Sequence, residues 1–103
     1  MAYNPFDLTG KVALVTGGNS GIGLGMARAM AQAGADIAIW GTNAAKNTAA
    51  RHALADTGRR IETMECDVGD EAQVDISFAR TLEAFGRVDG CFANAGVSGR
   101  GVT

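Results

Sequence analysis

The sequence has 103 residues, of which 47% are hydrophobic and 19% charged, and its formal net charge is −2. This length allows at most one small domain, and this composition indicates a folded core rather than a disordered chain. The acidic balance gives no reason to expect a nucleic-acid partner, and the absence of a signal peptide or long apolar stretch predicts a cytoplasmic protein without membrane contact.

The first third of the chain predicts a strand, a helix and a second strand. Residues 11–16 are apolar and end at glycines, as in a strand buried on both faces. Residues 20–34 predict a helix, because apolar side chains recur every three or four positions and Gly34 provides a stop. These apolar positions are Ile22, Met26, Ala29, Met30 and Ala33. Residues 36–40 predict the second strand.

The same alternation continues toward the end of the chain. An alanine-rich helix is predicted over 44–56, with Asn43 as its N-cap and Gly58 as its stop. Residues 61–66 predict a third strand, and Asp70 then opens a helix in which Gln73 completes a capping box. The apolar stripe of this helix comprises Val74, Phe78, Leu82 and Phe85. Residues 88–94 predict the fourth strand, and the glycine-rich end, 97–103, is expected to be a loop.

Strands that alternate with helices predict an α/β fold, a three-layer, doubly wound parallel sheet with strand order 3-2-1-4. The face of the sheet that receives only the helix before the fourth strand is expected to be under-covered, and the fourth strand is also expected to be an exposed apolar edge. The two cysteines, Cys66 and Cys91, match no disulfide or zinc pattern, and we interpret both as small buried residues. No metal site is expected.

The loop between the first strand and its helix reads Thr16-Gly17-Gly18-Asn19-Ser20-Gly21-Ile22-Gly23. Such a loop offers a diphosphate both backbone N–H groups and the positive end of a helix dipole. We expect Gly17 to permit the turn, Gly21 to allow close backbone approach and Gly23 to let the helix pack on the sheet. A purely structural turn is the alternative, because the glycine spacing differs from Gly-x-Gly-x-x-Gly.

These residues resemble the classical short-chain dehydrogenases/reductases, which carry Thr-Gly-x-x-x-Gly-Ile-Gly after the first strand. Asp67-Val68 and Ala93-Asn94-Ala95-Gly96 resemble two further family motifs, the second with its first residue changed. The resemblance implies a Rossmann fold that binds NAD or NADP, with Asp67 and Val68 at the adenine and the backbone of 94–96 along the ribose. Capping of a turn is the alternative role for Asp67, and Asn94 is expected to tie the fourth strand to its neighbour.

The predicted cofactor-binding residues are Gly17, Asn19, Ser20, Gly21, Ile22, Gly23, Gly41, Thr42, Asn43, Asp67, Val68, Asn94, Ala95 and Gly96. After the second strand the chain lacks the acidic residue that binds the ribose 2′-OH in NAD-specific Rossmann domains. Thr42, Asn43 and Lys46 could instead donate to a 2′-phosphate. We therefore favour NADP, although the arginine typical of NADP-preferring relatives is absent and NAD stays open.

No catalytic residue is assigned within the chain. The resemblance implies catalysis by a serine and a Tyr-x-x-x-Lys pair, whereas the one tyrosine, Tyr3, has no lysine four residues later. These groups are expected beyond residue 103, and His52 is interpreted as a solvated residue. Residues 1–103 are therefore interpreted as the N-terminal portion of one Rossmann domain, with 97–103 leading to the missing half.

The predicted function is that of an NAD(P)-dependent oxidoreductase, with hydride transfer between the nicotinamide and a small carbonyl or alcohol substrate. The resemblance also suggests a homodimer or homotetramer. The alternative is a nucleotide-binding module that lacks catalysis, because the chain itself offers no acid or base for the reaction.

Overall fold

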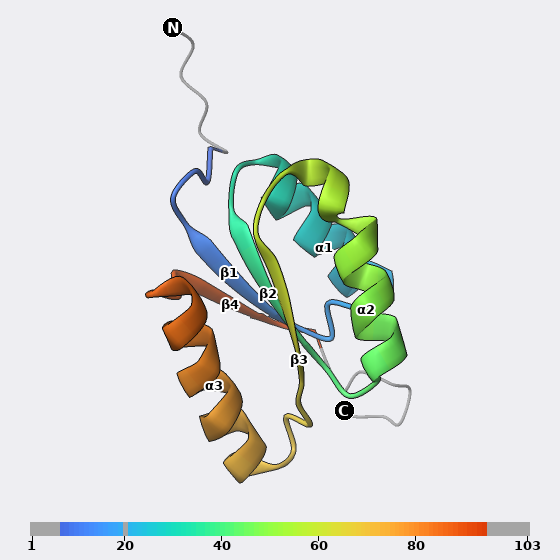
Figure 1. The fold of residues 1–103 in the computed structure, drawn as a ribbon, viewed down its shortest axis with the longest axis vertical. Coiled ribbons are helices and arrows are strands. Elements are labelled where there is room, and N and C mark those ends of the chain that lie inside the picture. The colour runs from blue at the N-terminus through green and yellow to red at the C-terminus, as the bar shows by residue number, and fades with distance from the viewer. Residues whose placement is uncertain (1–6, 20, 95–103) are drawn as a thin grey trace, which may run out of the picture.

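The computed structural model describes residues 7–19 and 21–94 as a parallel sheet between two layers of helices. Its four strands lie in the order β3-β2-β1-β4, which confirms the predicted topology. α1 and α2 cover one face of the sheet and α3 lies on the other (Figure 1). The elements are β1 (Val12–Thr16), α1 (Gly21–Gln32), β2 (Asp36–Gly41), α2 (Ala44–Ala53), the 3₁₀ helix η1 (Ala55–Thr57), β3 (Ile61–Glu65), α3 (Glu71–Phe85) and β4 (Gly90–Ala93). The loop expected at 97–103 lies outside the described residues.

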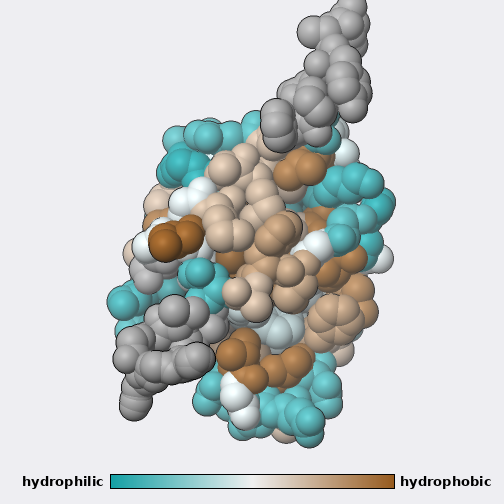
Figure 2. All heavy atoms as spheres, turned by 180° about the vertical axis from the view of Figure 1, so that it is seen from behind, coloured by the Kyte–Doolittle hydropathy of each residue, from teal (hydrophilic) through white to brown (hydrophobic). Residues whose placement is uncertain are grey.

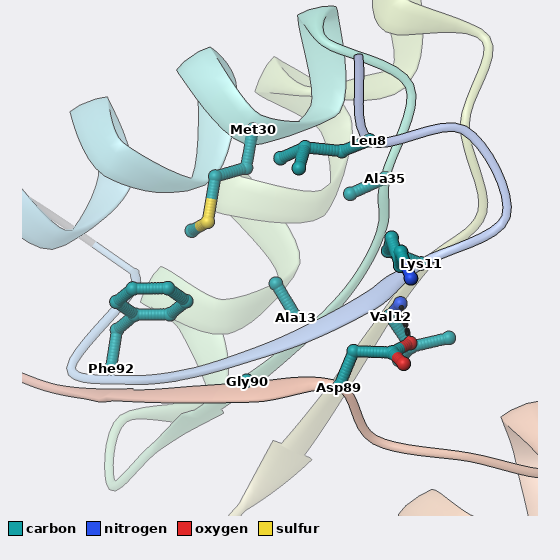
Figure 3. A pocket seen from close by; sticks show the side chains of 9 residues that line it. All are labelled: Leu8, Lys11, Val12, Ala13, Met30, Ala35, Asp89, Gly90 and Phe92. Carbon is teal, nitrogen blue, oxygen red and sulfur yellow. Dashed lines mark hydrogen bonds between the residues drawn. The ribbon is translucent and has the colours of Figure 1, made fainter. Parts of the chain in front are cut away.

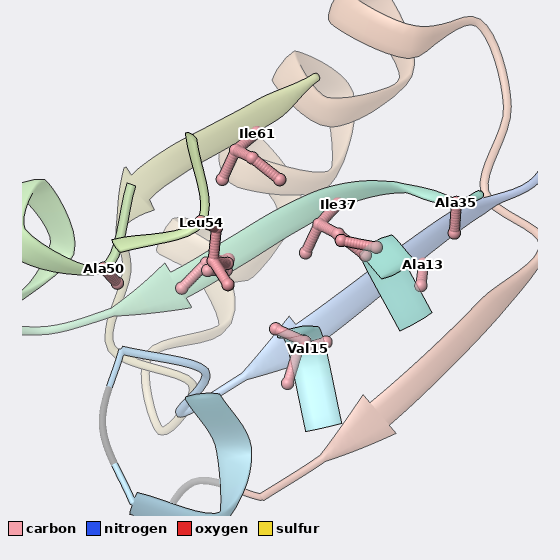
Figure 4. Packing of buried hydrophobic residues seen from close by; sticks show 10 residues of the cluster. Ala13, Val15, Ala35, Ile37, Ala50, Leu54 and Ile61 are labelled. Carbon is pink, nitrogen blue, oxygen red and sulfur yellow. The ribbon is translucent and has the colours of Figure 1, made fainter. Parts of the chain in front are cut away.

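β1 lies between β2 and β4, and every one of its residues is buried, as the apolar run predicts. Side chains alternate between the two layers of the sheet. Val15 packs with Ile37 and Leu54 on the side of α1 and α2 (Figure 4). Leu14 belongs to a second cluster, which contains Trp40 and lies on the side of α3. The first strand is thus the centre of both halves of the core.

The face that α1 turns toward the sheet differs from the predicted apolar stripe. Its buried residues are Gly23, Ala27 and Ala31. Ile22, the first residue of the predicted stripe, is 77% exposed. Small residues allow the helix to lie close to the sheet, but they contribute little to a hydrophobic pattern. Met30 of the predicted stripe does pack against the core, so the spacing predicted the helix correctly and its buried face only in part.

The predicted stripe of α3 is correct only in part. Val74 and Phe85 pack against the sheet, whereas Phe78 is 42% exposed. The buried positions in the middle of the helix are Ser77 and Thr81 instead. A hydrogen bond explains this choice, because the indole Nε1 of Trp40 donates to Thr81 Oγ1 at 3.1 Å. A polar face of α3 is thus buried because it meets the polar edge of a tryptophan.

The exposed edge expected at β4 is confirmed. Cys91, Phe92 and Ala93 are all exposed, so Cys91 is not the buried residue expected, whereas Cys66 is buried. Figure 2 shows apolar residues gathered across the middle of the molecule when it is seen from behind. Uncovered apolar surface of this kind is typical of a sheet edge on which further structure packs.

The ends of α2 and α3 follow the predicted capping. Asn43 Oδ1 accepts a hydrogen bond from the backbone N–H of Lys46 at 2.9 Å, and Asp70 accepts from the N–H groups of Ala72 and Gln73. α2 ends at Ala53, earlier than predicted, and the chain continues through η1 to Gly58, whose φ is 74°. No helix within 7–19 and 21–94 has both the length and the apolar character needed to cross a membrane.

Replacement of Thr81 by valine tests the contact between Trp40 and α3. Thr81→Val keeps the shape of the side chain but leaves the buried indole N–H without its acceptor, so the free energy of unfolding should fall by about 1–3 kcal/mol. Thr81→Ser keeps the hydroxyl and should cost about 1 kcal/mol or less. Urea unfolding followed by circular dichroism measures both. Equal losses in the two variants would show that the methyl group, not the hydrogen bond, matters at this position.

Candidate functional site

The loops that follow β1, β2 and β3 meet at the carboxyl edge of the sheet, as expected for parallel strands. They enclose a cavity of about 340 Å³. The residues that line it are Gly17, Asn19, Trp40, Gly41, Thr42, Cys66, Asp67 and Val68. Six of these are predicted site residues, and they come from three separate segments of the chain. Gly21, Ile22, Gly23, Asn43 and Asn94 are not part of this lining, and Ser20, Ala95 and Gly96 lie outside the described residues.

The loop after β1 turns sharply because of its glycines. Gly17 has a φ of 73°, a conformation that favours glycine, and its N–H donates to the carbonyl of Trp40 at 2.8 Å. Gly23 starts the buried face of α1 directly against this turn. A Cβ on Gly23 would lie 2.2 Å from the carbonyl oxygen of Gly17 and 2.8 Å from Asn94 Nδ2. The N-terminus of the helix can therefore approach the end of β1 only without a side chain here.

Asn94 joins β4 to the same turn. Its backbone N–H donates to the carbonyl oxygen of Thr16 at 3.0 Å and lies 3.2 Å from the Thr16 hydroxyl. These bonds of the Asn94 backbone continue the ladder between β1 and β4. The carboxyl ends of β1 and β4 are thus held together beside the N-terminus of α1.

Asp67 makes the local turn contact that the sequence analysis kept as an alternative role. Its Oδ1 accepts a hydrogen bond from the N–H of Gly69 at 2.9 Å. Its own N–H donates to Gln73 Oε1 at 2.9 Å, and Gln73 Nε2 donates to Asp70 Oδ2 at 3.0 Å. The capping box of α3 therefore closes on Asp67, not on the N–H of Asp70 itself. This turn contact holds the Asp67 carboxylate in the wall of the cavity.

The charged groups near the cavity are held by hydrogen bonds. Donation from the side chain and backbone of Gln73 lowers the pKa of Asp70 below its ordinary value, since these bonds favour the carboxylate. The ionised Asp70 caps α3 at the end that lies beside Asp67.

Sequence reasoning missed one residue of this region, Asn47. It lies in α2, it is only 4% exposed, and its side chain accepts a hydrogen bond from Asn19 Nδ2 at 2.9 Å. The available signal was its position, because Asn47 shares the buried side of α2 with Ala50. A polar residue on a buried helix face needs hydrogen-bond partners, which in this structure are supplied by the site.

A second cavity of about 290 Å³ lies between α1 and the strands β1 and β4. Its walls are mainly apolar, with Met30 of α1 directed toward Phe92 of β4 (Figure 3). The charged end is occupied by Asp89, which accepts a hydrogen bond from the N–H of Val12 at 2.8 Å. None of the predicted site residues lines this second cavity, so the carboxyl edge is the better candidate site.

Comparisons with a family model and with individual proteins indicate the same family. The model of a family described as short chain dehydrogenase matches residues 11–103. A probable NADP-dependent mannitol dehydrogenase from Yarrowia lipolytica is 40% identical over 92 residues, which cover 89% of this chain and 33% of the relative. Levodione reductase from Leifsonia aquatica is 39% identical over 94 residues, which cover 89% of this chain and 35% of the relative.

Solved structures agree with these relatives. The crystal structure of an NAD⁺-bound xylitol dehydrogenase superposes with a TM-score of 0.85 at 34% identity, over 86% of this chain and 34% of that one. Levodione reductase gives a TM-score of 0.84 at 38% identity, over 87% of this chain and 36% of that one. The chain thus spans about a third of the length of the curated relatives that it matches.

Two glycines of α1 provide a matched test of the close approach. Gly23→Ala forces a methyl group into the carbonyl of Gly17, and such overpacking should lower the free energy of unfolding by about 1–3 kcal/mol. A Cβ on Gly25 meets nothing within 4 Å. Gly25→Ala should therefore raise the free energy of unfolding by about 0.5–1 kcal/mol, as expected for an exposed helical position. Thermal unfolding of both variants measures the difference, and a Gly23→Ala protein as stable as Gly25→Ala would contradict the packing described.

Proposed function

Because this chain belongs to the short-chain dehydrogenases, we propose that the whole protein is an NAD(P)-dependent oxidoreductase. The reaction would be hydride transfer between the nicotinamide and a small carbonyl or alcohol substrate. One observation carries the proposal, namely the contact of Gly23 with the Gly17 carbonyl beside a cavity formed by three strand ends. This contact leaves room for a diphosphate to approach backbone N–H groups at a helix N-terminus.

The residues of the carboxyl edge fit a dinucleotide. The backbone of 17–23 would hold the diphosphate, and Asp67 and Val68 would contact the adenine. Gly41, Thr42 and Asn43 would lie at the adenine ribose, and the segment 94–96 would follow the second ribose. When bound, the nicotinamide donates or accepts the hydride. The part of the protein described by this structure would bind and orient the cofactor, and the proton donor is proposed to come from a serine and a Tyr-x-x-x-Lys pair outside these residues.

NADP is the proposed cofactor. Thr42 lines the cavity and no carboxylate stands at residues 41–43 to repel a 2′-phosphate. Asn43 uses its Oδ1 to cap α2, which leaves its amide nitrogen as the donor end of the side chain. The names of the relatives do not decide the matter, because one is called NADP-dependent and another was solved with NAD⁺.

A nucleotide-binding module without catalysis is the second candidate function. It is considered because every site residue assigned within these 103 residues serves nucleotide binding. Titration of the whole protein with NADPH and NADH, followed by nicotinamide fluorescence, tests both candidates. We expect binding and then oxidation of NADPH in the presence of a panel of small carbonyl compounds that includes levodione, the compound in the name of one relative. Absence of binding would refute both candidates, and binding without oxidation across the panel would favour the module.

The cytoplasmic location and the dimer or tetramer expected from the family resemblance stay predictions. Native mass spectrometry of the whole protein would test the second of them.

A charge at residue 42 tests the proposed cofactor preference. Thr42→Asp places a carboxylate beside the expected 2′-phosphate, so the Kd for NADPH should rise by at least about tenfold, while the Kd for NADH should change by less than about threefold. Thr42→Asn introduces a side chain of nearly the same shape as aspartate but without the charge. It should leave the preference for NADPH over NADH unchanged. An equal loss of both cofactors in Thr42→Asp would place the 2′-phosphate elsewhere.

A further inference from the structure

The side chain of Asn47 joins three segments of the carboxyl edge from behind the cavity. Its Oδ1 accepts a hydrogen bond from Asn19 Nδ2 at 2.9 Å. Its Nδ2 donates to the carbonyl oxygens of Gly41 at 3.0 Å and Met64 at 3.3 Å. The loop after β1 is thus connected to the ends of β2 and β3 through one buried amide.

These contacts determine which way both amides face. A carboxamide has an acceptor end and a donor end, and the donor end of Asn47 is directed to two backbone carbonyls. Its oxygen must then face Asn19, which has to present its own nitrogen. Asn19 lines the cavity, whereas Asn47 does not. The carbonyls of the sheet therefore set the orientation of a side chain at the ligand site without touching the ligand.

The bridge between the two asparagines depends on a missing side chain. A Cβ on Gly41 would lie 2.3 Å from Asn19 Nδ2 and 2.5 Å from Asn47 Oδ1. Gly41 is buried, so no side chain could turn outward to avoid the two amides. The amide pair thus occupies the space that a side chain at residue 41 would need, and it requires a glycine there.

We propose that Asn47 is a positioning residue for nucleotide binding, which acts through Asn19 to order the loop after β1 before the ligand arrives. A loop that is already ordered loses less conformational freedom on binding, so its affinity is higher. This inference rests on the proposed function, in which that loop holds the diphosphate. The ordered loop should therefore raise the affinity for the ADP half of the cofactor.

A double-mutant cycle on the whole protein tests the proposal, with ADP-ribose and NADPH as probes. Asn47→Leu and Asn19→Ala should each raise the Kd of both probes by about fivefold to tenfold, as expected for one lost hydrogen bond and a less ordered loop. The double variant should bind no more weakly than Asn47→Leu alone, because the same interaction is lost only once. Thr48→Leu, at the exposed neighbouring position of α2, is the matched control and should bind like the unchanged protein. Losses that multiply in the double variant would overturn the proposal.

Backbone amide exchange of residues 17–23 in the ligand-free protein gives a readout independent of binding. Exchange should accelerate to the same extent in Asn47→Leu, Asn19→Ala and the double variant, and it should not change in Thr48→Leu. If Asn47→Leu fails to fold, Asn19→Ala removes the same hydrogen bond from the loop and decides the test. Unchanged exchange in Asn19→Ala would overturn the role of Asn47. Failure of the unchanged protein to bind either probe would refute the proposed function, and the exchange rates would then decide only whether Asn47 orders the loop.

Discussion

The close contact between the N-terminus of α1 and the carbonyl of Gly17 is the constraint on which the rest of the structure depends. A Cβ at Gly23 would lie 2.2 Å from that carbonyl oxygen, so the helix can start here only with a glycine. Once the helix starts this close to β1, its next buried positions must also be small, and they are Ala27 and Ala31. The same contact directs the backbone N–H groups of the first turn toward the carboxyl edge of the sheet. Packing of α1 on the sheet and the proposed binding of a ligand therefore both require a glycine at residue 23.

The sequence predicted the elements and their order because these follow from strong local signals. Apolar runs ended by glycines marked the strands, and Asn43 and Asp70 marked two helix starts that the structure confirms. The buried faces of α1 and α3 were harder to predict. A hydrophobic pattern counts the large apolar residues, whereas these helices bury glycine, alanine, serine and threonine. The exposure of Cys91 was missed for a related reason, since its burial depends on what covers β4 and not on the residue type.

The candidate site was predictable where one segment carries its own signal. The glycine loop and the Asp67-Val68 pair are of this kind, and both line the cavity at the carboxyl edge. Asn47 was not predictable, because its role comes from contacts with residues 28 positions earlier and 17 positions later in the chain. The turn contact considered for Asp67 is present, whereas its contact with adenine stays a proposal. A carboxylate that caps its own turn is held in place by that turn, which suits a group in the wall of a binding cavity.

Trp40 contacts both the loop after β1, at the carboxyl edge of the sheet, and α3, on one face of it. Its carbonyl accepts from Gly17 at 2.8 Å at the site, while its indole donates to Thr81 of α3 at 3.1 Å. A change at residue 40 that removes the indole would leave the buried hydroxyl of Thr81 without this donor. A change at residue 81 that removes the hydroxyl would leave the indole N–H without its acceptor. Over evolutionary time, residues 40 and 81 should therefore vary together more often than separately. Aligned sequences of close relatives would then carry a record of how the layer of α3 is joined to the second strand of the sheet.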